Sequence, residues 1–199
     1  MTALPVEVIL MCGLPASGKT TTAGRLHRAL GGVLIRSCDV YADLGISLPA
    51  WVRRTQGFTR DVAAYERERD RAYLEMARRL DDALAQRARP VIVDAVLGEP
   101  DKRRAMCGIA RRRGAEPVLL WCRCDGIEEV RRRFAARAGR DAMPEHEAAD
   151  LSVLRHIQTL WEDPSDDAPI VVYDTLRHDV SVFDPTAGPL QRLLATALA

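Results

Sequence analysis

The sequence has almost no net charge, few aromatic residues and no long apolar run. Lysine and arginine number 29 against 28 acidic residues, so the formal charge of +1 gives no general attraction to nucleic acid or to membranes. The apolar run at 6–14 lacks a basic region before it and is too short to span a bilayer. We therefore expect a cytoplasmic protein without a membrane partner.

Cysteine is also scarce, and its spacing is irregular. The five cysteines are Cys12, Cys38, Cys107, Cys122 and Cys124. Their odd number does not fit a disulfide framework, and one residue between the last two is the wrong spacing for a zinc site. We expect free thiols, mostly buried, in a reducing compartment.

Short apolar runs alternate with longer amphipathic stretches along the chain. The runs predict five strands, at 6–10, 32–36, 91–96, 118–122 and 170–173. The segment 61–89 predicts a helix with Tyr73, Ala77, Leu80 and Leu84 on one stripe, ending before Pro90. This alternation is typical of an α/β fold in which helices cover both faces of a parallel sheet. The length of 199 residues suits one such domain over 1–199.

One motif points directly to chemistry. The segment 13–20 matches G-x-x-x-x-G-K-[ST] and stands between a strand and a helix-forming run, as a P-loop should. Its glycines let backbone N–H groups converge on phosphate oxygens at a helix N-terminus. Lys19 should reach the β- and γ-phosphates, and Thr20 should offer its hydroxyl to Mg²⁺. The nucleotide-binding residues that we expect are Gly13, Leu14, Pro15, Ala16, Ser17, Gly18, Lys19, Thr20 and Thr21.

Two aspartates occupy strand-end positions, where ligands bind in an open parallel sheet. Asp39 follows the predicted strand at 32–36, and Asp94 lies in the predicted strand at 91–96. A kinase acting on an alcohol uses one carboxylate to accept the hydroxyl proton and another to orient hydrated Mg²⁺. We assign Asp39 the first role and Asp94 the second, although the roles could be exchanged. The structural alternatives are a helix N-cap at Asp39 and a turn partner at Asp94.

Two irregular segments could complete a site. The insertion 41–60 carries Trp51, Phe58 and several arginines, which suits an acceptor pocket as well as simple packing. The segment 127–147 predicts a helical lid, in which Arg133, Arg137 and Arg140 share one face. Lid arginines can neutralise charge on the γ-phosphate in the transition state, and a solvated basic face is the alternative.

These motifs together resemble the P-loop small kinases grouped with zeta-toxin, gluconate-kinase and polynucleotide-kinase-like proteins, over 6–173. The segments that carry the resemblance are 13–20, 37–39, 93–95, 133–137 and 149–158. The resemblance implies a nucleoside-monophosphate-kinase-like sheet with a helical lid, ATP with Mg²⁺, Asp39 as the base that activates the acceptor, and Arg133 or Arg137 as the catalytic lid arginine. It implies no particular acceptor.

Three functions follow from this interpretation. The leading hypothesis is an ATP-dependent kinase that phosphorylates a hydroxyl group of a small molecule. A polynucleotide 5′-hydroxyl kinase is a second hypothesis, but the neutral net charge and few aromatic residues argue against a nucleic-acid partner. A nucleotide-dependent switch or ATPase is the third. It would consume ATP without an acceptor, whereas a kinase with a closing lid should hydrolyse little ATP alone.

Overall fold

A computed structural model describes residues 6–46, 62–137, 151–165, 168–182 and 188–198. Its strands are β1 (Val8–Cys12), β2 (Val33–Arg36), β3 (Val91–Asp94), β4 (Pro117–Arg123), β5 (Ile170–Asp174) and β6 (Asp179–Val182). Its helices are α1 (Lys19–Leu30), α2 (Ser37–Asp43), α4 (Val62–Ala85), α5 (Pro100–Arg112), α6 (Ile127–Arg137), α7 (Leu151–Thr159) and α8 (Gly188–Leu198).

The strands form one sheet in the order β2-β3-β1-β4-β5-β6. The first five are parallel, as the sequence predicts, and β6 adds an antiparallel edge to β5. The sequence analysis missed β6 because Asp179-Val-Ser-Val is short and polar. The predicted helix at 61–89 is α4, which ends earlier, at Ala85.

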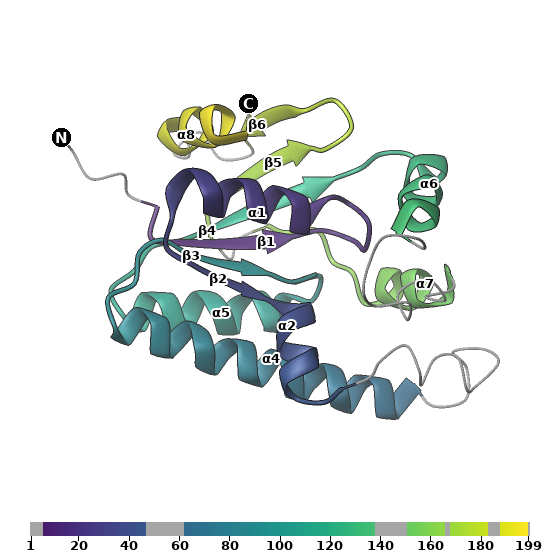
Figure 1. The fold of residues 1–199 in the computed structure, drawn as a ribbon, viewed down its shortest axis with the longest axis horizontal. Coiled ribbons are helices and arrows are strands. Elements are labelled where there is room, and N and C mark those ends of the chain that lie inside the picture. Colours follow the sequence, from purple (N-terminus) through teal and green to yellow (C-terminus); the bar gives the residue numbers. More distant parts are fainter. Residues whose placement is uncertain (1–5, 47–61, 138–150, 166–167, 183–187, 199) are drawn as a thin grey trace.

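Helices cover both faces of the sheet (Figure 1). Along β1, Val8 and Leu10 face α4 and α5, whereas Ile9 and Met11 face α1 and α8. Both faces of β1 are therefore completely buried, which explains its continuous apolar run. Among the helices in the described ranges, none combines the length and the apolar character needed to cross a membrane.

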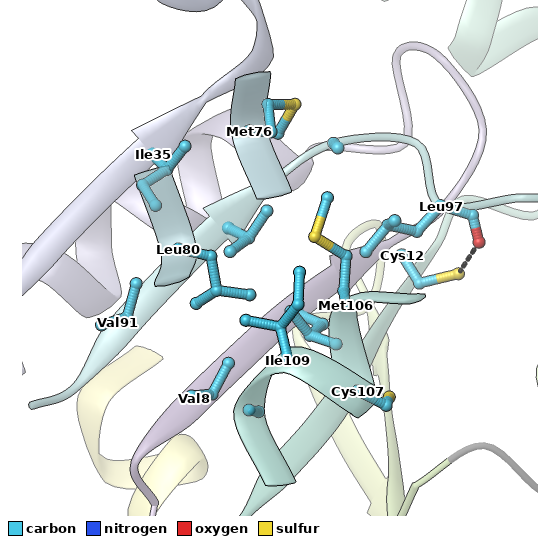
Figure 2. Packing of buried hydrophobic residues seen from close by; sticks show 14 of the residues in the cluster. Val8, Cys12, Ile35, Met76, Leu80, Val91, Leu97, Met106, Cys107 and Ile109 are labelled. Atoms are coloured by element: carbon cyan, nitrogen blue, oxygen red, sulfur yellow. Dashed lines mark hydrogen bonds between the residues drawn. The ribbon is translucent and has the colours of Figure 1, made fainter. Parts of the chain in front are cut away.

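The larger core lies between the sheet and the α4–α5 pair. Figure 2 shows Met76 and Leu80 of α4 and Met106 of α5 packed over the strands. Tyr73, Leu80 and Leu84 are buried there and Ala77 packs at its margin, which confirms the predicted stripe. Burying a side chain of this size contributes roughly 1.5–3 kcal/mol. This packing fixes the strands whose carboxyl ends carry the candidate site.

Candidate active site

The loop between β1 and α1 begins at Gly13, a position that accepts only glycine. Gly13 has a φ of 149°, and a Cβ there would lie 2.5 Å from the carbonyl oxygen of Cys122 and 2.6 Å from Oγ of Ser17. Its N–H donates to the carbonyl of Val96, 3.0 Å away. The start of the loop is thus pressed between the chain segments that follow β3 and β4.

The loop ends at the N-terminus of α1, where positive potential gathers. Gly18 has a φ of 94°, and Lys19 is the first helical residue. The Lys19 ammonium is largely buried and donates to the carbonyl of Leu14 at 2.8 Å, so it folds back across the loop. The first turn of α1 contains no acidic residue to offset the helix dipole. An anion such as a phosphate group would be stabilised here.

Asp94 lies on the α1 face of the sheet, close to this loop. It ends β3, is 3% exposed, and pairs in register with Met11 of β1 and Arg36 of β2. Burial raises the pKa of the nearby Cys122 thiol to about 12; the Lys19 charge opposes this shift and the Asp94 charge adds to it. The charges of Lys19 and Asp94 therefore both act on the Cys122 thiol. Asp94 thus lies on the face of the sheet that α1 covers, at the carboxyl end of the strand next to β1.

Asp39 lies in the first turn of α2, directly after β2. It is exposed, lies 3.7 Å from the Arg36 guanidinium, and accepts a weak hydrogen bond from the Cys38 thiol at 3.5 Å. The N-cap position of α2 is occupied by Arg36, so Asp39 is not the cap. Burial raises the pKa of Cys38, and the charges of Asp39 and Asp94 both add to that shift. The two aspartates therefore stand at the ends of neighbouring strands, and the charges of both act on one thiol.

Arg133 of the expected lid contacts the phosphate loop in this structure. Its guanidinium donates to the hydroxyl of Thr175 at 2.8 Å, to the Thr175 carbonyl at 3.1 Å and to the Ala16 carbonyl at 3.3 Å. Glu129 accepts a hydrogen bond from Nε of Arg133 at 2.7 Å. Hydrogen bonds from Arg132 and Arg133 lower the pKa of Glu129 to about 2, so this carboxylate stays charged at neutral pH. The middle of α6 is thus joined to the phosphate loop and to Thr175.

Several predicted residues lie outside the described part of the chain. Arg137 is the last residue of α6, but its side chain lies outside the described part, and so does the whole of Arg140. The insertion is described only at 41–46, so its aromatic and arginine side chains at 51–60 also lie outside. Their roles stay predictions.

The sequence analysis overlooked Thr175 and Arg36. The Thr175 hydroxyl lies 2.7 Å from the Ser17 carbonyl and 3.0 Å from the Arg123 carbonyl, and its side chain sits against Gly18. Arg36 reaches Asp39 and shares a register position with Asp94. Both residues stand at carboxyl ends of strands, so the strand-end rule that identified the aspartates could have found them.

The loop after β3 is fixed by a buried arginine of α5. Arg103 is 1% exposed, and its Nη1 lies 3.0 Å from each of three carbonyl oxygens, those of Leu97, Gly98 and Glu162. The Leu97 N–H also donates to the Tyr73 hydroxyl at 3.1 Å. Because Glu162 follows α7, Arg103 joins the loop that supports Gly13 to the segment that leaves α7.

A cavity of about 360 Å³ lies between the phosphate loop and the α6–α7 pair. Leu14, Pro15 and Ser17 line it on the loop side, and Trp121 and Trp161 line it on the opposite side. Oγ of Ser17 is buried and has no hydrogen-bond partner among the described residues. The arrangement provides a partly open space beside the phosphate loop, with a mixed lining of apolar, polar and charged residues.

Comparisons with known proteins agree with this architecture. A family model described as AAA domain matches residues 8–164. No curated protein matches the chain. An unliganded sugar kinase from Janibacter sp. HTCC2649 superposes with a TM-score of 0.61 at 18% identity, over 96% of this chain and 93% of that one.

Two solved structures with bound nucleotide analogues are also similar. Kti12 from Chaetomium thermophilum, in complex with ADP-AlF3, gives a TM-score of 0.60 at 21% identity, over 96% of this chain and 99% of that one. APS kinase from Mycobacterium tuberculosis, in complex with AMPPNP and APS, gives 0.57 at 16% identity, over 96% of both. At these identities the likeness concerns the fold, whereas the family match covers most of the sequence. The chain belongs to the AAA domain family and has the fold of the P-loop kinases.

Proposed function

We propose that the protein is a kinase that transfers the γ-phosphoryl group of ATP to a hydroxyl group of a small molecule. The observation that carries this proposal is the placement of Asp39 and Asp94 at the carboxyl ends of the adjacent strands β2 and β3, next to β1, whose following loop leads to Lys19. An anion site, a buried carboxylate and an exposed carboxylate are the three parts that phosphoryl transfer to an alcohol requires.

In the proposed complex, the backbone of the phosphate loop cradles the β- and γ-phosphates. Lys19 exchanges its hydrogen bond with the Leu14 carbonyl for phosphate oxygens, a stronger charge-assisted contact. The nucleotide analogues bound to Kti12 and to APS kinase support a nucleotide in this fold. Thr21, exposed in the first turn of α1, lies within the segment that we expect to line the phosphates.

The residues present also fit Mg²⁺. Among the described residues, no group of three or more His, Cys, Asp or Glu could hold a metal ion by itself. Thr20 is exposed at the start of α1, and Asp94 is buried on the same face of the sheet. A hydroxyl and one carboxylate are the protein ligands that a phosphate-bound Mg²⁺ uses, directly or through water. When bound, the ion would neutralise charge on the phosphate oxygens.

Asp39 is the proposed base. It is exposed, so an acceptor hydroxyl can approach it, and it lies one strand away from the buried Asp94. The hydroxyl oxygen attacks the γ-phosphorus, its proton passes to Asp39, and ADP leaves. Arg36 stands beside Asp39 and can hold a transferred phosphoryl oxygen.

Arg133 is the proposed lid arginine, with Arg137 as the second candidate. In this structure the Arg133 guanidinium donates hydrogen bonds to the Ala16 carbonyl and to Thr175. These contacts place a permanent positive charge at the edge of the phosphate loop. We propose that the segment 127–147 closes over the nucleotide, brings a lid arginine to the γ-phosphate and excludes water. The segment 41–60 is the proposed acceptor-binding insertion of this single domain.

Replacing the proposed base gives the direct test. Asp39→Asn keeps the size of the side chain but removes the proton acceptor, so phosphoryl transfer should fall roughly 10²–10⁴-fold. Radiolabelled ATP is offered with a panel of sugars, nucleosides and other hydroxylated metabolites. The matched control is Asp82→Asn on α4, because Asp82 is exposed, pairs with Arg78 of its own helix and lies outside the site. Unimpaired transfer by Asp39→Asn would remove Asp39 from this role. ATP hydrolysis that no acceptor stimulates would instead indicate an ATPase.

A further inference from the structure

A second set of charged side chains gathers at the phosphate-loop end of the sheet. Glu66 and Arg69 lie in the N-terminal half of α4, Glu99 precedes α5, and His156 lies on α7. Figure 1 shows α7 next to this half of α4, at the end of the sheet where the β1–α1 loop lies. We call the four residues the charged array.

Short contacts join the members of the charged array. Arg69 Nη2 donates to Glu66 at 2.5 Å and to Glu99 at 3.1 Å. The second carboxylate oxygen of Glu66 lies 2.5 Å from Nε2 of His156. The Arg69 guanidinium also lies over the Tyr65 ring, 5.8 Å from its centroid. Glu66 thus joins Arg69 to His156 of α7, and Arg69 in turn joins Glu66 to Glu99.

The charged array is accessible and unevenly charged. Arg69 is 93% buried, and within the described ranges its Nε has no hydrogen-bond partner. The Glu66 and Glu99 side chains remain 29% and 28% exposed. Two carboxylates face one guanidinium, so the carboxylates outnumber the guanidinium in the charged array. The two partly exposed carboxylates are hydrogen-bond acceptors, while the arginine charge is already neutralised.

The loop after β3 connects the charged array to the phosphate site. Val96 accepts the hydrogen bond of Gly13, and Glu99 follows three residues later. Asp94, at the start of the same stretch, faces the phosphate loop. Because Glu99 belongs to the loop that follows β3, a molecule docked against it would lie near the carboxyl end of β3, next to the strand that leads to Asp39.

We propose that the charged array is an acceptor subsite that selects a polyhydroxylated molecule carrying no carboxylate or phosphate group. This inference rests on the proposed kinase function. Hydroxyl groups donate strong hydrogen bonds to ionised carboxylates, and adjacent hydroxyls can bridge Glu66 and Glu99. A negatively charged acceptor would be repelled by both glutamates, and Arg69 could bind it only by giving up its present partners.

Removing the two carboxylate charges should reverse this selectivity. In Glu66→Gln/Glu99→Gln the Arg69 charge becomes available for an anion. Binding of neutral hexoses, pentoses and cyclitols is measured by calorimetry with AMPPNP and Mg²⁺ present, beside the matching aldonic and uronic acids and phosphate esters. We expect the wild-type protein to bind a neutral compound at least tenfold more tightly than its matched acid, and the double variant to lower that ratio at least tenfold.

The control separates recognition from a structural clasp between α4 and α7. Asp70→Asn removes another α4 carboxylate, one that pairs with Lys102 of α5, and should leave the selectivity ratio unchanged. If the charged array only holds α4 and α7 together, Glu66→Gln/Glu99→Gln should lower the midpoint temperature of thermal unfolding without changing the selectivity ratio. Glu99→Gln alone, which keeps the contact with His156, serves if the double variant does not fold; its ratio should fall at least threefold.

The outcomes also separate this inference from the kinase proposal. Tighter binding of the acids by the wild-type protein, an unchanged ratio in the variants, or binding of neither set would overturn the subsite. Phosphorylation of an acid in preference to its neutral partner would overturn the subsite and leave the kinase intact. Selective polyol binding without any phosphoryl transfer would support the subsite and refute the kinase.

Discussion

The phosphate loop and the charged array lie at the same end of the sheet but are held in different ways. The loop takes its shape from backbone: glycines at positive φ, and hydrogen bonds to carbonyls of the segments beside it. The charged array takes its shape from side chains that reach across three elements. Backbone geometry suits a ligand part that is constant, such as a polyphosphate, whereas side chains can be exchanged to suit a particular acceptor.

This comparison is tested most strongly at Lys19, the charged side chain within the phosphate loop. Lys19→Met removes the ammonium at the helix N-terminus and leaves the backbone cradle in place. We expect phosphoryl transfer to fall about 10³-fold, which corresponds to roughly 4 kcal/mol of transition-state stabilisation. Steady-state kinetics with ATP and the acceptor measure this loss.

Lys102→Met is the matched control, because Lys102 is the other lysine of the chain and pairs with Asp70 on the protein surface. It should keep its activity within about twofold, since exposed ion pairs contribute little. A Lys19→Met protein with near-normal transfer would mean that the backbone alone binds the phosphates in their reactive arrangement.

Arg103 tests whether the two regions depend on one support. The loop after β3 carries both the Val96 carbonyl that accepts from Gly13 and Glu99 of the charged array. Arg103→Met would leave carbonyls of this loop without a buried donor. We expect the free energy of unfolding to fall by about 3 kcal/mol. Urea titration measures it, and KM should rise for both ATP and the acceptor.

The neighbouring Arg104→Met gives the comparison for this change. Arg104 pairs with Asp101 within the same helix and is well exposed, so its loss should cost about 0.5 kcal/mol or less. A small effect of Arg103→Met, or an effect on only one of the two KM values, would show that the regions are supported independently.

The sequence revealed the phosphate loop and its surroundings much better than the charged array, for a physical reason. The P-loop is a contiguous pattern, and Asp94 ends a strand whose apolar run is visible in the sequence. The burial of both faces of β1 also follows from its continuous apolar run. Elements of this kind are determined by residues close together in the chain, so a single sequence contains them.

The contacts that the sequence did not reveal join distant residues. Arg103 reaches the Glu162 carbonyl over 59 positions, Arg133 reaches Thr175 over 42, and His156 reaches Glu66 over 90. Nothing in local spacing distinguishes these residues from ordinary charged surface residues. In the sequence the charged start of α4 looks like an ordinary solvated face, and only the contacts of His156 and Glu99 with it show otherwise.

Gly13→Ala asks how closely the backbone of the phosphate loop is fitted. The added methyl group would meet the Cys122 carbonyl and Ser17 Oγ at distances far below normal contact, at a φ that L-residues rarely adopt. We expect a loss of about 2 kcal/mol in the free energy of unfolding, measured by urea titration, and weaker binding of AMPPNP. Gly24→Ala, in the open middle of α1, should instead add about 0.5–1 kcal/mol, because alanine favours a helix and the new methyl group meets no atom closer than 3.7 Å. If both substitutions changed the free energy of unfolding in the same direction, the loop would be adjustable. Its shape would then come from the bound phosphates rather than from β1 and its neighbours.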